Sequence, residues 1–440
     1  MRRAFITILR WNLKKLAQWT LSRHRPGVIA ITGSVGKTSA KLAIASVLAT
    51  ERHVRCSHGN LNNDLGLPLT ILGDWSEEEF ALVSREIPAG KKLFRKLAFW
   101  GKVIVRSFAH LAFFGEQEYP EILVLEYGAD RPDDLNYLLT IAKPNVSVIT
   151  AIGDIPVHVE FFTGPDDVAR EKARLIEGLP STGFAVLNYD DESVMNLKDR
   201  TRGHVITFGM GKGAEIRIAN FENRAEVGPS ASFRSGQPMG IAFRVEYGGR
   251  GITVRLPGVF GKTHAYAAGA AAAVGLIFGM SLQGIAEKLK AYTPAPGRSR
   301  LIPGIKGTFI IDDTYNASPL SMHAALDTLK DLPGKRKIAV LGDMRELGKY
   351  TMQAHERVGR LAAKAADVLV TIGPRAKFIA EAARGAGLSK KNIWSFDSAE
   401  DAQTSVQDLI KKGDLVLVKA SRAVQLEKIV EEIQALPETT

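Results

Sequence analysis

The chain has 440 residues, of which 45% are hydrophobic and 24% are charged, as in an ordinary folded protein of about three domains. Its single cysteine, Cys56, excludes a disulfide framework within the chain and a cysteine-rich zinc site, and it fits a reducing cytoplasm. The formal net charge of +11 is unevenly spread, because residues 1–26 hold seven lysines and arginines and no acidic residue.

The first predicted element is a basic amphipathic helix over residues 4–22, within an N-terminal unit of residues 1–26. Apolar side chains from Phe5 to Trp19 recur at nearly helical spacing, with lysines and arginines between them. The helix either packs on the main domain or lies on an anionic membrane. No nucleic acid is expected as a partner, because no nucleic-acid fold motif accompanies the charge. The N-terminus also lacks the features of a secretory signal peptide, so we expect a cytoplasmic protein.

A phosphate-binding loop is predicted after the first strand, at TGSVGKTS. Glycines let backbone N–H groups approach phosphates, and the N-terminus of the following helix favours an anion. The lysine can reach the β and γ oxygens, and the threonine hydroxyl can bind Mg²⁺. The motif is a shortened Walker pattern, and an ordinary glycine turn is the alternative. The expected nucleotide-binding residues here are Gly33, Ser34, Val35, Gly36, Lys37, Thr38 and Ser39.

Two unusual segments come next. A loop rich in asparagine, with Asn60, Asn62 and Asn63, offers amide donors to a ligand, although such residues also favour plain turns. Residues 91–114 combine six lysines and arginines with several aromatic residues and no acid. This second segment is either interfacial or a helical insertion that packs on its own domain.

A carboxylate and an imidazole follow two buried strands. EILVLE ends in Glu126, and His158 comes after the strand KPNVSVITAIG. Ligands of open α/β sheets collect beyond the carboxyl ends of strands, so both side chains are expected beside the phosphates, as partners of Mg²⁺ or of its water shell. The helix over residues 166–179 contains Lys172, which the pattern alone predicts to be exposed.

The second half of the chain changes character twice. Alternating residues over 203–256 predict antiparallel strands, and an uncharged, alanine-rich run over 263–286 predicts one buried helix. The segment 293–300 is rich in proline and glycine and predicts a hinge. Beyond it, strands and helices alternate without a G-x-G-x-x-G motif, which predicts a second parallel α/β domain without a dinucleotide cofactor.

The predicted fold class is therefore α/β, with a central P-loop-type, mostly parallel sheet, an added antiparallel section and a Rossmann-like C-terminal domain. The expected boundaries are 1–26 for the N-terminal helix, 27–296 for the central domain with an insertion at about 75–118, and 297–440 for the C-terminal domain.

Together these motifs resemble the Mur ligase superfamily, the ATP-dependent amide-forming enzymes of cell-wall precursor synthesis, over about residues 27–436. TGSVGKTS matches its phosphate loop, GNLNNDLGLPLT its asparagine loop and LEYGAD its magnesium glutamate. AREKARLIEGL matches the helix whose lysine is carbamoylated, and PGRSR supplies the interdomain arginine. IDDTYNASPLSM resembles a motif beside the nucleotide, and LGDMRELG, His355 and KASR complete the C-terminal pattern.

The resemblance implies ATP and Mg²⁺ as cofactors and gives roles to individual residues. Lys37, Lys172 and His158 would be catalytic, and Thr38 and Glu126 would hold one Mg²⁺. His158 and a carbamate on Lys172 would hold a second ion. Further residues implied to contact ligands are Arg298, Asp313, Tyr315 and Asn316 for the nucleotide, and Asn60, Asn62 and Asn63 for the substrate.

The likeness is greatest to members that add D-alanyl-D-alanine to a UDP-muramoyl-peptide, so a nucleotide-linked peptide precursor and a dipeptide or amino acid are the expected partners. Alternatives are a related ligase that adds another amino acid or glutamate, and a membrane-associated P-loop switch or scaffold. Only 26 residues precede the first strand, so the family's UDP-binding first domain is expected to be absent. KTHAYAAG contains His264 but lacks the asparagines of the family pattern.

Overall fold

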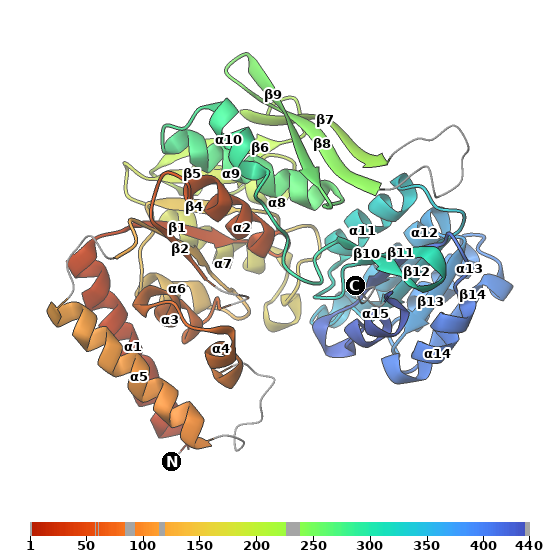
Figure 1. The fold of residues 1–440 in the computed structure, drawn as a ribbon, viewed down its shortest axis with the longest axis horizontal. Helices are drawn as coiled ribbons and strands as arrows, with labels where there is room; N and C mark the ends of the chain where they lie inside the picture. The colour runs from red at the N-terminus through yellow and green to blue at the C-terminus, as the bar shows by residue number, and fades with distance from the viewer. Residues whose placement is uncertain are drawn as a thin grey trace, which may run out of the picture.

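Two β-sheets with helices on both faces form the body of the molecule and lie side by side (Figure 1). The computed structural model describes residues 2–57, 59, 61–83, 93–113, 119–225 and 238–435. The first sheet has nine strands in the order β2-β3-β1-β4-β5-β6-β7-β8-β9, and the second has six in the order β10-β11-β15-β12-β13-β14. This mixed architecture confirms the predicted fold class, while the exact domain boundaries stay predictions.

The first sheet is parallel on one side and antiparallel at the other end. Its strands are β1 (Gly27–Thr32), β2 (Val54–Cys56), β3 (Ile122–Glu126), β4 (Val146–Ile149), β5 (Phe184–Asn188), β6 (His204–Gly209), β7 (Ile216–Ala225), β8 (Pro238–Tyr247) and β9 (Arg250–Pro257). β6 was predicted to be antiparallel, but it pairs in parallel with both β5 and β7. Antiparallel pairing begins only between β7 and β8. The prediction for β6 was wrong because alternation of side chains indicates a strand but not the direction in which it pairs.

Both faces of this sheet are covered by helices, so the inner strand β1 has no polar face. Ile29 and Ile31 of β1 pack towards α2 (Lys37–Leu48) and α9 (Lys262–Ile277). Val28 and Ala30 pack on the opposite face. The helices on that face include α3 (Gly66–Leu72), α6 (Asp134–Leu139) and α7 (Pro165–Glu177), and α8 (Glu192–Met195) follows β5. A strand buried on both faces explains the unbroken apolar run before the phosphate loop.

The alanine-rich run forms two helices instead of the single predicted helix. α9 ends at Ile277, and α10 (Leu282–Leu289) begins after Ser281, whose side chain accepts a hydrogen bond from Gly284 N. Gly279 between them has φ of 80°, a left-handed conformation that ends helices. The prediction of a buried element is right, because α9 is almost wholly enclosed. Among the described residues, no helix has the length and apolar run needed to cross a bilayer.

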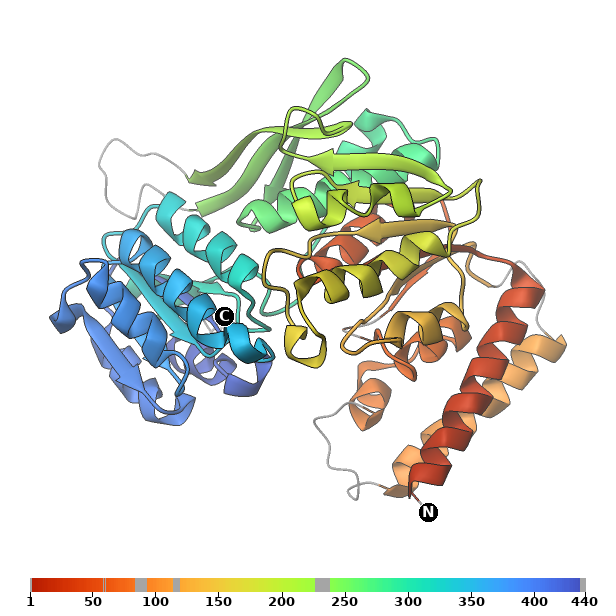
Figure 2. The same ribbon diagram turned by 180° about the vertical axis from the view of Figure 1, so that it is seen from behind.

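Two long helices extend from the edge of the first domain, and both views show them side by side (Figures 1 and 2). They are α1 (Arg2–His24) and α5 (Leu93–Phe113), and the short α4 (Glu77–Val83) precedes α5. Leu13 of α1 and Val103 of α5 meet Leu69 of α3 in a separate apolar cluster. The N-terminal helix therefore packs on its own domain through one face, as one of the two predicted alternatives required.

The second domain is a sheet covered on both faces. Its strands are β10 (Arg300–Gly304), β11 (Thr308–Asp312), β12 (Lys337–Gly342), β13 (Val368–Ile372), β14 (Ile393–Phe396) and β15 (Leu415–Lys419). Its helices are α11 (Pro319–Asp331), α12 (Thr351–Ala365), α13 (Lys377–Gly385), α14 (Ala399–Leu409) and α15 (Glu427–Ile433). Ile155 and Phe260 of the first domain join its apolar core, so the two domains share a packed contact.

Candidate active site

The phosphate loop has the backbone geometry that its glycines permit. Gly33 has φ of 146° and Gly36 has φ of 88°, both in the region that favours glycine. A Cβ atom at Gly33 would lie 2.1 Å from Thr150 Oγ1, so only glycine fits there. Lys37 opens α2, and its Nζ donates to Gly33 O at 2.8 Å. The lysine side chain therefore folds back onto the backbone of its own loop, at the N-terminus of a helix.

Glu126 is the point at which three segments of the chain converge. Its carboxylate, at the end of β3, is buried and accepts a hydrogen bond from Thr38 Oγ1 at 3.1 Å. Asn62 Nδ2 donates to its other oxygen at 3.1 Å. Burial by itself would raise the pKa of Glu126, but the charges of Lys41, Lys37 and Arg298 outweigh burial and hold that pKa below its usual value. The site thus keeps an ionised carboxylate away from water.

Lys41 is a site residue that the sequence analysis missed. It lies one helical turn after Lys37 and is fully buried, with Nζ 3.6 Å from Glu126 Oε2. The same ammonium group donates to Gly59 O at 2.6 Å, which ties the asparagine loop to α2. The sequence did contain a signal for this residue. Lys41 follows Lys37 by four positions in KTSAKLAIA, so both lysines lie on one face of the helix, and the neighbours of Lys41 are apolar.

The asparagine loop is described only in part. Asn62 contacts Glu126, and its backbone oxygen accepts a hydrogen bond from Gly128 N at 2.8 Å. Asn63 Oδ1 instead accepts hydrogen bonds from the backbone at Leu65 and Gly66, where α3 begins. Asn60 lies outside the described residues. Of the three predicted substrate residues, the structure therefore joins Asn62 to the carboxylate and uses Asn63 to start a helix.

Lys172 is buried, in contrast to the exposed position that the helical pattern predicted. Only 1% of the residue is exposed, because α7 turns this side chain inward together with Val168 and Ala173. Burial, followed by the charge of Lys37, lowers the pKa of Lys172 to about 7. A neutral amine is therefore well populated at neutral pH, which is the state that reacts with CO₂.

His158 joins two carboxylates from different domains. Its φ of 67° places it in the left-handed region, and its Nε2 lies 3.3 Å from Asp130 Oδ1. Its Nδ1 lies 2.6 Å from Glu346 Oε2, which comes from the second domain. The sequence analysis missed both acids. Asp130 stands in LEYGAD, four residues after Glu126, but Glu346 reaches this place only through the packing of the domains.

Arg298 brings the hinge to the phosphate loop. Its Nη2 donates to Thr38 Oγ1 at 3.3 Å, and its guanidinium lies 3.9 Å from the centre of the Tyr315 ring. Its Nε is buried and has no hydrogen-bond partner among the described residues. Its backbone oxygen contacts Nε2 of His264, a residue whose pKa is lowered to about 4 by burial. The predicted interdomain arginine is therefore in place, with one donor unused.

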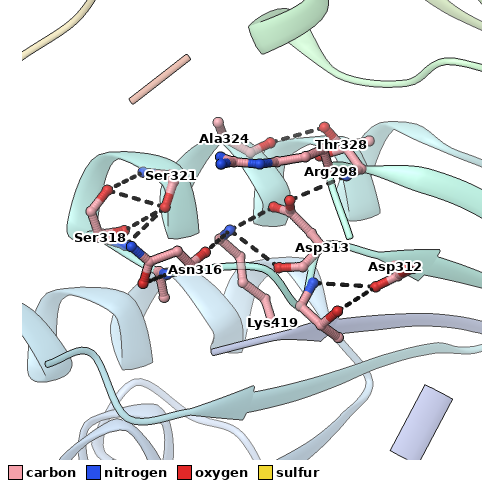
Figure 3. A network of polar contacts seen from close by, with 12 residues as sticks. Arg298, Asp312, Asp313, Asn316, Ser318, Ser321, Ala324, Thr328 and Lys419 are labelled. Atoms are coloured by element: carbon pink, nitrogen blue, oxygen red, sulfur yellow. Dashed lines mark hydrogen bonds and ion pairs between the residues drawn. The ribbon is translucent and has the colours of Figure 1, made fainter. Parts of the chain in front are cut away.

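Asp313 and Asn316 belong to a loop that Lys419 organises (Figure 3). Lys419 Nζ lies 2.6 Å from Asp313 Oδ2 and donates to Asn316 O at 2.8 Å. Asp313 Oδ1 accepts from Ser299 N at 3.2 Å. Burial raises the pKa of Asp313, although Lys419 opposes that shift, and burial also lowers the pKa of Lys419. The structure thus brings both residues to the hinge, Tyr315 against the guanidinium of Arg298 and Asp313 to the backbone of Ser299.

Comparison with known proteins explains why these groups are together. Residues 107–274 match the Mur ligase middle domain, and residues 297–422 match the Mur ligase glutamate ligase domain. UDP-N-acetylmuramoyl-tripeptide–D-alanyl-D-alanine ligase of Bacillus subtilis is 30% identical over 428 residues, or 97% of this chain and 79% of that protein. The chain belongs to the Mur ligase family.

Solved Mur ligases have the same architecture over nearly the whole chain. MurF of Acinetobacter baumannii superposes with a TM-score of 0.75 at 26% identity, over 96% of this chain and 80% of that one. MurF ligase of Thermotoga maritima, solved in complex with ADP, gives a TM-score of 0.74 at 26% identity, over 96% and 83%. The predicted resemblance is confirmed, and with it an ATP-dependent, ADP-forming ligase that makes amide bonds.

Proposed function

We propose that this Mur ligase joins D-alanyl-D-alanine to the peptide carboxylate of a UDP-N-acetylmuramoyl-tripeptide, with the residue roles expected from the sequence. The substrate assignment rests on the names of the relatives, which give this reaction for proteins of Bacillus subtilis and of other bacteria. Within the chain, the convergence of Lys37, Thr38 and Arg298 around Glu126 supports a phosphoryl-transfer site. The reaction belongs to peptidoglycan precursor synthesis.

The chemistry needs activation of a carboxylate, because oxide is a poor leaving group. The carboxylate attacks the γ phosphorus of ATP, the bond to ADP breaks, and an acyl phosphate forms. The dipeptide amine then attacks the acyl carbon, phosphate leaves and the amine loses a proton. Lys37 and Arg298 are the cations that can balance charge on the migrating phosphoryl group, and positioning provides most of the remaining catalysis.

Oxygen ligands suitable for Mg²⁺ meet at the phosphate loop. Thr38 Oγ1 and Glu126 Oε2 are 3.1 Å apart, close to the roughly 3 Å between neighbouring ligands of an octahedral Mg²⁺. The two groups therefore fit one ion. When bound, it would neutralise phosphate oxygens of the nucleotide. Among the described residues no group of three or more His, Cys, Asp and Glu side chains forms a site, so the protein would share the ion with phosphates and water.

A second ion would use His158 and a carbamate on Lys172. The neutral amine of Lys172 would add to CO₂, forming an N–C bond and releasing one proton, which converts a neutral amine into an anionic carbamate. Burial beside Asp130 and Glu171, together with a pKa of about 7, makes the amine available for this reaction. His158 is held by Asp130 at 3.3 Å, which places it in the same neighbourhood of acids.

Release of ADP by the purified full chain tests the proposal. We expect release only when ATP, the UDP-linked tripeptide and D-alanyl-D-alanine are all present. A panel of single amino acids, including glutamate, replaces the dipeptide in parallel. Faster turnover with a member of the panel would overturn the dipeptide assignment but leave the ligase chemistry standing.

Substitution of Lys172 tests its assigned role separately. Lys172→Ala should lose nearly all turnover and regain part of it with added short carboxylates, which can occupy the place of the carbamate. Arg170→Ala, on the exposed side of the same helix, is the matched control and should behave like the wild type. Full activity of Lys172→Ala without added carboxylate would contradict the carbamate. Contact with an anionic membrane is not required by this chemistry and stays a prediction of the sequence.

A further inference from the structure

The outward side of α1 carries an exposed aromatic stripe. Ile8, Trp11, Lys15 and Trp19 follow one another at helical spacing, so they share one face. Trp11 is 60% exposed and Trp19 is 52% exposed, although large aromatic side chains are usually buried. The buried side of the same helix, which includes Leu13, packs on α3 and α5. The stripe therefore points away from the domain.

The neighbouring helix α5 has a second stripe. Phe94, Leu97, Val105 and Phe108 all lie on one face, and Phe94 is 88% exposed. Ala98 and Gly101, also exposed, fill the same face, so it contains no charged residue. Phe99 and Val103 face the opposite way and pack into the apolar cluster with α3. α1 and α5 lie side by side (Figure 2), and each buries its other face in the cluster with α3, so both stripes lie on exposed sides of the pair.

Positive charge accompanies these stripes without negative charge on either helix. The sequences of α1 and α5 contain no aspartate or glutamate. Of the acids near the pair, Asp64 pairs with Arg10 and Glu79 pairs with Lys102, while Glu78 of α4 lines a cavity with Arg95 of α5. Lys15 stands between the two tryptophans of the stripe, and Arg23 follows them at the end of α1. Neither has an ion-pair partner among the described residues.

We propose that the exposed face of α1 and α5, defined by Trp11, Lys15, Trp19, Phe94, Val105 and Phe108, binds the surface of an anionic lipid bilayer. The helices would lie in the interface, with aromatic rings at headgroup depth and lysine and arginine at the lipid phosphates. The longer helix offers roughly 34 Å of contact along its axis. This surface lies outside the ligase site and does not depend on the proposed substrate.

The charge of the two helices favours a bilayer over a second copy of the chain as the partner of this face. Two copies meeting through this face would bring Lys15 and Arg23 of each α1 together with no acid on either helix to balance them, and like charges across an interface are unfavourable. A bilayer with anionic headgroups supplies negative charge beside Lys15 and Arg23, and each lysine or arginine near such a surface adds to binding. A flat layer also suits two helices that lie side by side.

Flotation of the full chain with phosphatidylcholine vesicles, with and without phosphatidylglycerol, tests the proposal at low and high salt. We expect flotation only with the anionic vesicles, weaker at high salt because exposed charges are screened. Trp11→Glu/Phe108→Glu should reduce the fraction bound at least about tenfold, since charged groups replace aromatic side chains at the interface. Val205→Glu/Met352→Glu, two exposed apolar positions elsewhere, is the matched control and should float like the wild type.

Three results would overturn the proposal. The first is a protein that stays unbound with both kinds of vesicle at low salt. The second is undiminished flotation of Trp11→Glu/Phe108→Glu, which would place the contact elsewhere. The third is a concentration-dependent dimer, measured by sedimentation without vesicles, that this variant dissociates, because the face would then join two copies. An unchanged unfolding midpoint shows that each variant is folded.

Discussion

Among the residues that the structure describes, each domain of this ligase has one buried lysine–carboxylate ion pair, and the two pairs differ in what surrounds them. Lys419 Nζ lies 2.6 Å from Asp313 Oδ2 and donates its other hydrogen bonds to backbone oxygens of the same loop. Lys41 is 3.6 Å from Glu126, which is also approached by Thr38 and Asn62. The Lys419 pair receives one further hydrogen bond, from Ser299 N at the hinge, whereas the carboxylate of the Lys41 pair is approached by side chains from several segments.

The pKa shifts of the two carboxylates run in opposite directions. Burial raises the pKa of Asp313, because Lys419 compensates only part of the desolvation. Burial also acts on Glu126, but Lys41, Lys37 and Arg298 together lower its pKa. A surplus of cations around one carboxylate suits a site that receives phosphates and metal, while a self-contained pair suits a structural clamp. The comparison predicts that substitutions around Glu126 in the first domain impair activity, and that loss of Lys419 in the second domain impairs stability.

Loss of Lys37 should have the largest effect. Lys37→Ala removes a charge at the phosphate loop, so ADP release should fall by at least about 10³-fold, or roughly 4 kcal/mol of transition-state stabilisation. The unfolding midpoint should not change. Lys198→Ala, at an exposed lysine of the same domain, is the control and should keep full turnover. Rapid turnover by a folded Lys37→Ala would remove the phosphate loop from the mechanism.

Loss of Lys419 should act on stability. Lys419→Ala leaves Asp313 buried without its cation, which costs about 3 kcal/mol and lowers the unfolding midpoint of the second domain by roughly 6–12 °C. Calorimetry measures this shift. Lys428→Ala, which breaks the largely exposed pair with Glu400, should move the midpoint by less than about 2 °C. Equal shifts in the two variants would show that Lys419 is no clamp.

Lys41 should affect activity more than stability, although it is equally buried. Lys41→Met keeps the side-chain volume but releases Gly59 and the asparagine loop, so kcat/KM should fall by about 10- to 100-fold. Without this cation the pKa of Glu126 rises, so the acid limb of the pH profile of kcat/KM should move to higher pH. An unmoved acid limb would separate Lys41 from the carboxylate.

The smallest effect concerns the protonation of Lys172. With a pKa of about 7, the initial rate of carbamoylation at fixed dissolved CO₂ should rise about tenfold from pH 6 to pH 8 and then level off. An ordinary exposed lysine would gain about 100-fold over the same range and continue to rise. Incorporation of labelled CO₂ measures this rate. A profile that does not level off would mean that Lys172 is not held in the buried state.

The sequence predicted what local chemistry encodes. The phosphate loop, the strands that end at Glu126 and before His158, and the alternating elements of the second domain follow from patterns within one or two elements. Parallel pairing of β6, the break near Gly279 and the burial of Lys172 depend on contacts between elements, which periodicity does not report. Glu346 is the extreme case, because it meets His158 across the domain contact, 188 positions along the chain.

The hydroxyl of Thr38 links more partners than its size suggests. A hydroxyl has one hydrogen and two lone pairs. In this structure the hydrogen points to Glu126 and one lone pair accepts from Arg298 of the hinge, so a single lone pair remains for a cation. Carboxylate, hinge and ion therefore share one oxygen atom with no vacancy left over. Serine at this position would keep the donor hydrogen and both lone pairs of the hydroxyl, whereas valine, with nearly the same shape, would keep none of them.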